Sequence, residues 1–91
     1  MYRVSDAVRS THGQDGGVVL DVRQGRMFNL NFVGSRILEL LKSGSTESEI
    51  ANDISRAFDI SQELAENDVR EFIQTLKTHR LVEDHDSHGT A

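Results

Sequence analysis

The sequence predicts a single α+β domain of winged helix-turn-helix-like architecture, in which a three-stranded antiparallel sheet is followed by three helices. Three observations lead to this fold class. A chain of 91 residues supports one domain with a modest core. Its first third is rich in short and β-branched residues separated by turn signals, which predicts strands. From Phe32 onward the apolar residues recur at three- and four-residue spacing, which predicts helices.

The three strands are expected at residues 7–12, 18–22 and 26–30. The glycine-rich stretch at 12–17 reads as the first turn, and Gly25 supplies a residue suited to positive φ in the second. The last two strands are therefore expected to form a hairpin.

The register of this hairpin depends on the length of its loop. A three-residue loop places Leu20 opposite Phe28 and Val18 opposite Leu30, which gathers apolar side chains on one face. A two-residue loop instead places polar Asn29 opposite Leu20. We therefore expect the three-residue loop.

The first two helices have clear start or stop signals. The first begins at Phe32 and stops at Ser43-Gly44, with an apolar stripe formed by Val33, Ile37, Leu40 and Leu41. Thr46 and Glu49 form a capping box for the second helix, which should end near Phe58. Its expected apolar stripe comprises Ile50, Ala51, Ile54, Ala57 and Phe58.

The third helix is expected to be the longest element. Ser61 is its predicted N-cap, and the buried stripe comprises Ala65, Val69, Phe72, Ile73 and Leu76. Leu81 and Val82 provide a last apolar anchor. The domain is therefore expected to span residues 1–82, and residues 83–91 are expected to form a disordered acidic, histidine-containing tail.

Composition narrows the classes of function. The chain has no cysteine, which removes disulfides, thiolate zinc sites and cysteine nucleophiles and is compatible with a reducing compartment. No signal peptide or membrane span is evident, so a cytoplasmic location is expected. The net charge of -5 repels phosphate backbones and anionic lipids, so neither nucleic acid nor membrane is an expected partner.

The sequence contains no catalytic constellation. None of the four histidines lies in a nucleophile elbow, an HExxH motif or a phosphate-binding loop, so we expect neither enzymatic activity nor a cofactor. A divalent cation could in principle bind to the ligand set His79, Asp84, His85, Asp86 and His88. That site is disfavoured because a flexible tail loses chain entropy on forming it, and we expect no metal.

Two further features allow alternative binding modes. The stretch from Thr46 to Leu76 could be a DNA-binding helix-turn-helix, but residues 61–79 carry four acidic residues against two basic ones, which opposes groove binding. A short antiparallel sheet also leaves backbone groups unpaired at its edge, where an extended peptide could add as a strand. Alternatively, Arg26 or the N-terminal segment masks this edge, and composition alone leaves both readings open.

An ordered pattern along the chain points to a known family. It comprises Gly17-Val18-Val19-Leu20-Asp21, Gly25 to Asn31, Gly34, Ile37 to Leu41, Gly44, Thr46, Glu49-Ile50-Ala51, Asp68-Val69, Phe72-Ile73, Leu76 and Leu81. Over about residues 7–82, this pattern resembles the PqqD-like family, the precursor-peptide recognition elements of ribosomal peptide natural product biosynthesis.

The resemblance implies a non-catalytic adaptor. It implies that a leader peptide docks as an extra strand on the third strand, packs on the third helix, and is presented to a radical enzyme, leader protease or cyclase. The implied peptide-binding residues are Arg26, Met27, Phe28, Asn29, Leu30, Asp68, Val69, Phe72, Ile73 and Leu76.

Several of these implied residues must also serve the core. Five of them, Phe28, Leu30, Val69, Phe72 and Leu76, lie on apolar faces that any small domain buries. Met27, Asn29 and Asp68 are favoured for peptide contact because folding does not require them, and Arg26 could pair with acidic leader residues.

Within the family, Leu30 to Gly34 resembles the stand-alone recognition proteins of lasso-peptide clusters. The chain departs from their common pattern at Met27 and Phe28, where tyrosines are frequent, and at Leu38, where tryptophan is frequent. The expected function is therefore leader capture. The alternatives are a winged-helix regulator that binds DNA or protein, and a structural subunit whose sheet edge closes a homodimer.

Overall fold

The fold is described by a computed structural model for residues 2–13 and 16–84. Five strands and three helices follow one another along this part of the chain. They are β1 (Tyr2–Val4), β2 (Val8–Gly13), β3 (Gly16–Asp21), β4 (Arg26–Leu30), α1 (Phe32–Lys42), α2 (Glu47–Ala57), α3 (Gln62–Thr78) and β5 (Val82–Asp84).

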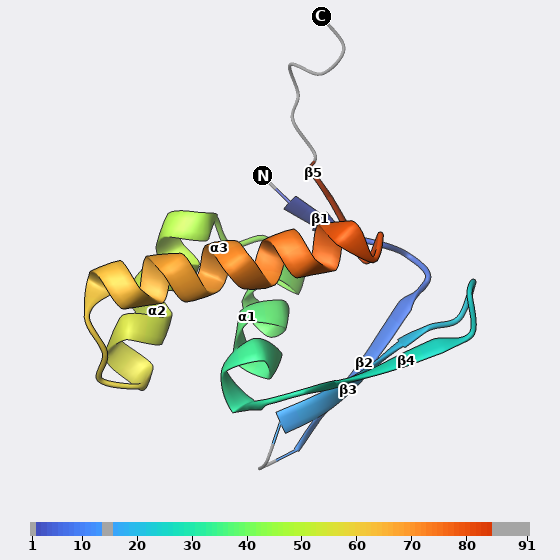
Figure 1. Cartoon of the computed structure of the whole chain (residues 1–91), viewed down its shortest axis with the longest axis horizontal. Helices are drawn as coiled ribbons and strands as arrows, with labels where there is room; N and C mark the ends of the chain where they lie inside the picture. Colours follow the sequence, from blue (N-terminus) through green and yellow to red (C-terminus); the bar gives the residue numbers. More distant parts are fainter. Residues whose placement is uncertain (1, 14–15, 85–91) are drawn as a thin grey trace, which may run out of the picture.

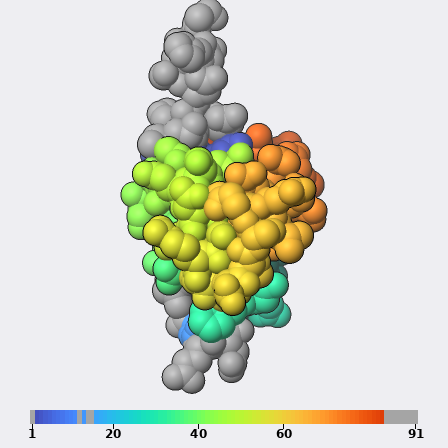
Figure 2. All heavy atoms as spheres, turned by 90° about the vertical axis from the view of Figure 1, so that its left-hand side faces the viewer, coloured from blue at the N-terminus to red at the C-terminus, as the bar shows by residue number. Residues whose placement is uncertain are grey.

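The three-stranded antiparallel sheet and the three helices confirm the predicted fold class. The strand order is β2-β3-β4, so β2 and β4 form the two edges of the sheet. Figure 1 shows α3 running across the molecule above this sheet, with α1 between them and α2 at the far end. Figure 2 shows that α2 and the beginning of α3 cover the end of the molecule away from the β3–β4 hairpin.

A second, two-stranded sheet was not predicted from the sequence. In it β1 pairs antiparallel with β5, so that Val4 lies opposite Val82. This pair brings the two ends of the domain together beside α3 (Figure 1). β5 includes Glu83 and Asp84, the first two residues of the expected tail, and the remainder of that tail lies outside the described residues.

The predicted helix starts are confirmed by their capping bonds. Thr46 and Glu49 form the reciprocal capping box, with N···O distances of 2.8 and 3.1 Å. Ser61 caps α3 by accepting from the Leu64 N–H at 3.1 Å. Asn31 caps α1 in the same manner, so the residue directly after β4 starts the first helix.

The core joins the sheet to all three helices. Val19 of β3 faces the helices, and the remaining buried apolar residues come chiefly from the stripes that helical spacing predicted. They are Ile37, Leu38, Leu41, Ile50, Ala51, Ile54, Ala65, Val69, Ile73, Leu76, Leu81 and Val82. Leu38 is only 1% exposed and therefore belongs to this core.

The predicted hairpin register is wrong by one residue. Val19, not Leu20, lies opposite Phe28, and Leu20 lies opposite Met27. The strands are joined by a four-residue loop, Val22–Gly25, because Asp21 pairs with Arg26. Since a shift of one residue moves side chains to the other face, Val19 and Phe28 point to the helices, whereas Leu20 and Met27 are exposed.

The side chain of Asp21 explains why the longer loop forms. It is 1% exposed, and its Oδ1 accepts from the backbone N–H groups of Arg23 and Gln24 at 3.1 and 3.2 Å. Gly25 then turns the chain at a φ of +68° and donates to the Asp21 carbonyl. Matching apolar pairs alone could not reveal this turn, because its geometry depends on a carboxylate.

An ion pair ties α1 to α2 on the surface. Arg36 donates two hydrogen bonds to the Asp53 carboxylate, at 2.7 and 2.9 Å. These bonds hold the pKa of Asp53 below its ordinary value.

Among the described residues, no helix is long and apolar enough to cross a bilayer.

Candidate functional site

The outer edge of β4 presents backbone groups that no other strand takes up in the described part of the chain. The backbone N–H of Val22 donates to the Ala7 carbonyl, which makes Ala7 and Val22 a hydrogen-bonded pair. Every second residue of β3 counted back from Val22 therefore bonds to β2, and the residues in between bond to β4. On β4 it follows that Phe28 bonds to β3, whereas the N–H and C=O groups of Met27 and Asn29 point outward. This edge can therefore accept one more strand.

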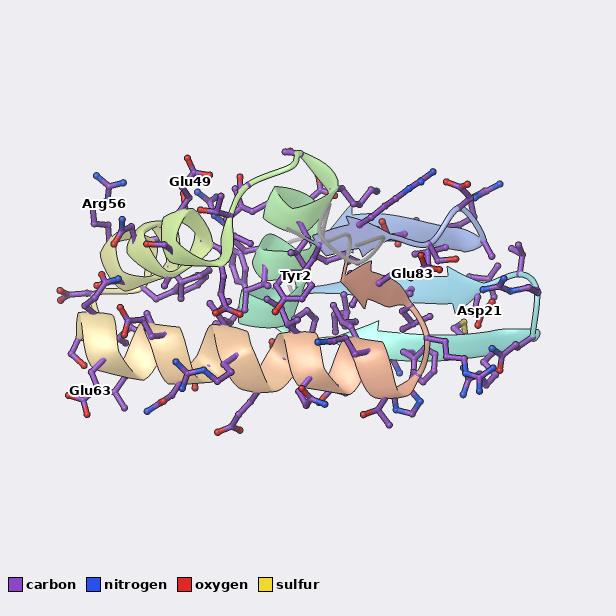
Figure 3. The ribbon with its side chains drawn as sticks, turned by 90° about the horizontal axis from the view of Figure 1, so that it is seen from above. Tyr2, Asp21, Glu49, Arg56, Glu63 and Glu83 are labelled. Carbon is purple, nitrogen blue, oxygen red and sulfur yellow. The ribbon has the colours of Figure 1, made fainter. Side chains whose placement is uncertain are left out.

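The two edges of the sheet have different surroundings. On β2, the Lys42 ammonium donates to the Ser10 hydroxyl at 2.8 Å, so a side chain of α1 reaches this edge. The β4 edge instead adjoins the C-terminal end of α3, where both Arg26 and Phe28 contact His79. In Figure 3 the strand overlaps only with the last turns of this helix. In the described part of the chain, the free edge at β4 thus adjoins a helix that could form one wall of a peptide site.

Side chains on β4 alternate between two faces. Arg26, Phe28 and Leu30 are half-buried and point toward the helices. Met27 and Asn29 are exposed, Met27 to 68%, and point to the opposite face of the sheet. A strand added at this edge would contact Phe28 and Leu30 on the helical side and Met27 and Asn29 on the other.

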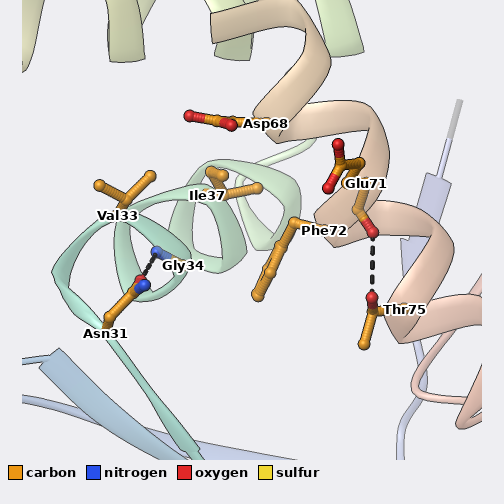
Figure 4. A pocket seen from close by; sticks show the side chains of 8 residues that line it. All are labelled: Asn31, Val33, Gly34, Ile37, Asp68, Glu71, Phe72 and Thr75. Carbon is orange, nitrogen blue, oxygen red and sulfur yellow. Dashed lines mark hydrogen bonds between the residues drawn. The ribbon is translucent and has the colours of Figure 1, made fainter. Parts of the chain in front are cut away.

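A stripe on α3 faces the end of β4. Asp68, Phe72 and Thr75 lie at helical spacing and, with Glu71, line an open pocket of about 350 Å³ between α3 and the start of α1. The α1 side is formed by Asn31, Val33, Gly34 and Ile37. Figure 4 shows Phe72 extending into the space between the two helices and Asp68 reaching across it above Val33 and Ile37.

Gly34 allows the two helices to approach each other at this pocket. A Cβ atom at position 34 would lie only 2.9 Å from Cε1 of Phe72, closer than carbon atoms normally pack. The glycine therefore fixes the position of the Phe72 ring against α1. The ring remains half-buried, with part of its surface open to the pocket.

The other end of β4 is fastened to the last turn of α3. Arg26 donates to the His79 carbonyl at 2.8 Å, and its guanidinium lies 5.3 Å from the centre of the Phe28 ring. Phe28 and His79 are in ring contact, with centroids 4.9 Å apart. Behind them, the buried carboxylate of Asp21 lies 3.6 Å from Arg26. Of the two masking alternatives left open by the sequence, Arg26 is directed to the end of α3 and the N-terminal strand β1 pairs with β5, not with β4.

The ten sequence-predicted peptide-binding residues divide into two groups. Val69, Ile73 and Leu76 are at most 3% exposed and belong to the core. The other seven lie on β4 or on the accessible stripe of α3: Arg26, Met27, Phe28, Asn29, Leu30, Asp68 and Phe72. The first group can support a site from behind, and only the second can contact a bound chain.

Sequence reasoning missed several residues that border this site, namely Asn31, Gly34, Glu71, Thr75 and His79. Extending the spacing from Asp68 and Phe72 along the same helix face reaches Thr75 and His79, so the helical period contained this signal. Glu71 lies one turn from Thr75, whose hydroxyl donates to its backbone carbonyl at 3.0 Å.

The alternative metal site cannot be assembled from the described residues. His79 contacts Arg26 and Phe28, while His85, Asp86 and His88 lie outside the described residues. No group of three or more His, Cys, Asp or Glu side chains within residues 2–13 and 16–84 is placed to hold a metal ion.

The surface of α3 does not have the charge of a DNA-reading helix. Its acidic residues Glu63, Glu66, Asp68 and Glu71 are all exposed, against the exposed Arg70 and the half-buried Lys77. A helix that enters a nucleic-acid groove needs a net positive charge near the phosphates. The charge of α3 therefore opposes its insertion into a nucleic-acid groove.

Comparison with known proteins agrees with this geometry. Residues 16–82 match the family model for coenzyme PQQ synthesis protein D (PqqD). A solved structure of TbiB1 in complex with the TbiA(beta) leader peptide is 35% identical and has a TM-score of 0.84, covering 93% of this chain and 99% of that one. Lasso peptide synthetase B1 complexed with the leader peptide shares the fold at 22% identity and a TM-score of 0.81, covering 91% of this chain and 98% of that one. No curated protein matches the chain.

Proposed function

The chain belongs to the PqqD family, and from this premise we propose that it binds the leader of a ribosomally synthesised precursor peptide by strand addition at β4. The bound leader forms a fourth strand of the sheet and packs against α3. The free backbone edge of β4 beside α3 is the observation that carries this proposal.

Strand addition uses features that the edge already provides. The outward N–H and C=O groups of Met27 and Asn29 supply main-chain hydrogen bonds, which give affinity without regard to side chains. Alternate side chains of the leader then meet either Phe28, Leu30 and the α3 stripe or the outer face of the sheet. Phe72 and the adjoining pocket supply selectivity on the helical side.

The complex of TbiB1 with a leader peptide supports this assignment, because that protein shares the fold along nearly its whole length. The role is that of a non-catalytic adaptor in the cytoplasm, where ribosomal precursors are made. It holds the leader while the rest of the precursor reaches a modifying enzyme, such as a radical enzyme, a leader protease or a cyclase.

A homodimer through the same edge is a second candidate, because any exposed strand can pair with a copy of itself. Such a dimer would occupy the backbone groups that the leader requires. Dimerisation and leader binding would therefore compete, and sizing with and without leader would separate them.

N-methylation of the leader backbone tests strand addition. The probe is the synthetic leader of a precursor peptide encoded beside this gene, methylated at one backbone nitrogen at a time. In a strand, alternate N–H groups point to β4, so we expect alternate positions to weaken binding about tenfold or more, measured by calorimetry. The positions between them should change affinity little. A uniform effect, or losses at three- and four-residue spacing, would instead indicate a helical or irregular ligand.

A further inference from the structure

A second pocket lies at the end of the molecule that carries the β3–β4 hairpin loop. It measures about 730 Å³ and is formed by the loop, the last turn of α3 and the start of β5. Its lining residues are Arg23, Gln24, Lys77, Arg80, Val82 and Glu83. Neither the strand edge nor the pocket at Phe72 includes any of them.

The charge of this pocket is opposite to that of the whole protein. It gathers Arg23, Lys77 and Arg80 against the single carboxylate of Glu83, although the chain has a net charge of -5. Within the described residues none of the three cations forms an ion pair. Lys77 lies over the Tyr2 ring at 5.3 Å, and Arg23 approaches the Ser5 hydroxyl at 3.4 Å. Unneutralised cations around a hollow favour an anionic ligand.

The pocket adjoins the Arg26 end of β4. A strand that pairs antiparallel with β4 continues the pattern of the sheet and runs from Leu30 toward Arg26. Gln24, which lines the pocket, is two residues from Arg26 and hence within about 7 Å along the backbone. Arg80 likewise follows directly on His79, which contacts Arg26 and Phe28. The segment after the paired strand therefore arrives beside the pocket.

We propose that this cationic pocket binds one or more acidic side chains of the precursor, located directly after the leader segment that pairs with β4. The proposal rests on the proposed function and adds a subsite to it. Binding at this point also fixes the direction of the leader, because a peptide in the opposite orientation would carry its acidic residues to the Asp68 and Glu71 end of the site.

The backbone conformation at Arg80 allows this cation to be removed by a substitution that does not strain the fold. Leu81 donates to the Leu76 carbonyl and Arg80 to that of Lys77, which is the Schellman pattern, and Arg80 has a φ of +59°. Glycine suits this left-handed position better than arginine. Arg80→Gly thus removes a cation while the unfolding temperature should stay the same or rise by about 4 °C.

Two matched controls are available at the opposite end of the molecule. Asp59 occupies the same left-handed position after α2, at a φ of +55°, so Asp59→Gly repeats the backbone change far from the pocket. Arg56→Gln repeats the loss of one positive charge, and Figure 3 shows Arg56 at the end away from the hairpin. Together the two controls show whether an effect of Arg80→Gly comes from a lost contact with the leader, from the changed backbone or from the changed net charge.

The experiment measures the affinity of a fluorescein-labelled leader for each variant by anisotropy at low salt. The native leader is compared with a version in which every Asp and Glu after the paired segment is changed to Asn or Gln. We expect Arg80→Gly to weaken binding of the native leader about fivefold to tenfold and binding of the amide version little. Both control variants should bind each peptide as the unmodified protein does.

The proposal is overturned by an equal effect of Arg80→Gly on both peptides, or by a leader with no acidic residue after the paired segment. If Arg80→Gly is without effect while Met27→Pro weakens leader binding about tenfold or more, the subsite is wrong and strand addition stands. If Met27→Pro is also without effect, the proposed function itself fails. If Arg56→Gln weakened leader binding as much as Arg80→Gly does, the effect would come only from long-range electrostatic attraction between protein and leader.

Discussion

Replacing Met27 by proline should reduce leader affinity about 10- to 100-fold while the sheet remains folded. The N–H of Met27 points away from β3, so the substitution removes no hydrogen bond of the domain itself. It removes a donor that the leader needs and places the proline ring where the leader backbone must approach. A leader carbonyl left without its donor accounts for an effect of this size.

The other edge of the sheet supplies the matched control for this variant. Ser10 of β2 is also an edge residue whose N–H points outward, since its neighbours bond to β3. Ser10→Pro should therefore cost the fold about as much as Met27→Pro and leave leader affinity unchanged. Calorimetric titration of both variants, with thermal unfolding measured in parallel, makes the comparison. Equal affinity losses in the two variants would refute the assignment of the site to β4.

Replacing Ile73 by alanine should lower the free energy of unfolding by about 2–5 kcal/mol. The side chain is 2% exposed in the core between α3 and its neighbours, and truncation leaves a cavity there. Phe72, the preceding residue, is half-buried and lines the pocket beside α1, so Phe72→Ala should act more strongly on leader affinity than on stability. Comparing these two adjacent residues thus distinguishes a contribution to stability from a contribution to leader binding.

Urea unfolding and leader titration of both variants, at a temperature where each is folded, test this division. Ile73→Val, which removes one methyl group, provides a milder version with an expected loss of about 0.5–1.5 kcal/mol. If Ile73→Val weakened leader binding as much as Phe72→Ala, the two residues would share one role, and the division of α3 into core and contact stripes would be wrong.

The helices could be predicted from the sequence because their signals are local. The Thr46–Glu49 capping box and the Ser61 cap act within one turn, and the apolar stripes repeat at the helical period. The short β1–β5 pair could not be found in this way, since it joins three-residue strands from opposite ends of the domain. Such pairing depends on the assembled core and not on either segment alone.

The hairpin register failed for a related reason. Matching apolar pairs favoured the register with Leu20 opposite Phe28. The loop length is instead set by the buried carboxylate of Asp21, which accepts from the backbone N–H groups of Arg23 and Gln24. The family resemblance predicted a site on β4 and α3, but it could not separate the core residue Ile73 from the exposed stripe. That separation depends on which face of α3 meets the other helices.

An NMR titration of the labelled protein with the leader of any short precursor peptide encoded beside its gene tests the central claim most directly. Strand addition at β4 predicts that the largest amide shifts occur at residues 26–30 and along the α3 stripe from Asp68 to His79. The outward N–H groups of Met27 and Asn29 should also gain protection from hydrogen exchange. Shifts confined to β2 or to α2, or no change at saturating leader, would contradict leader capture at this edge.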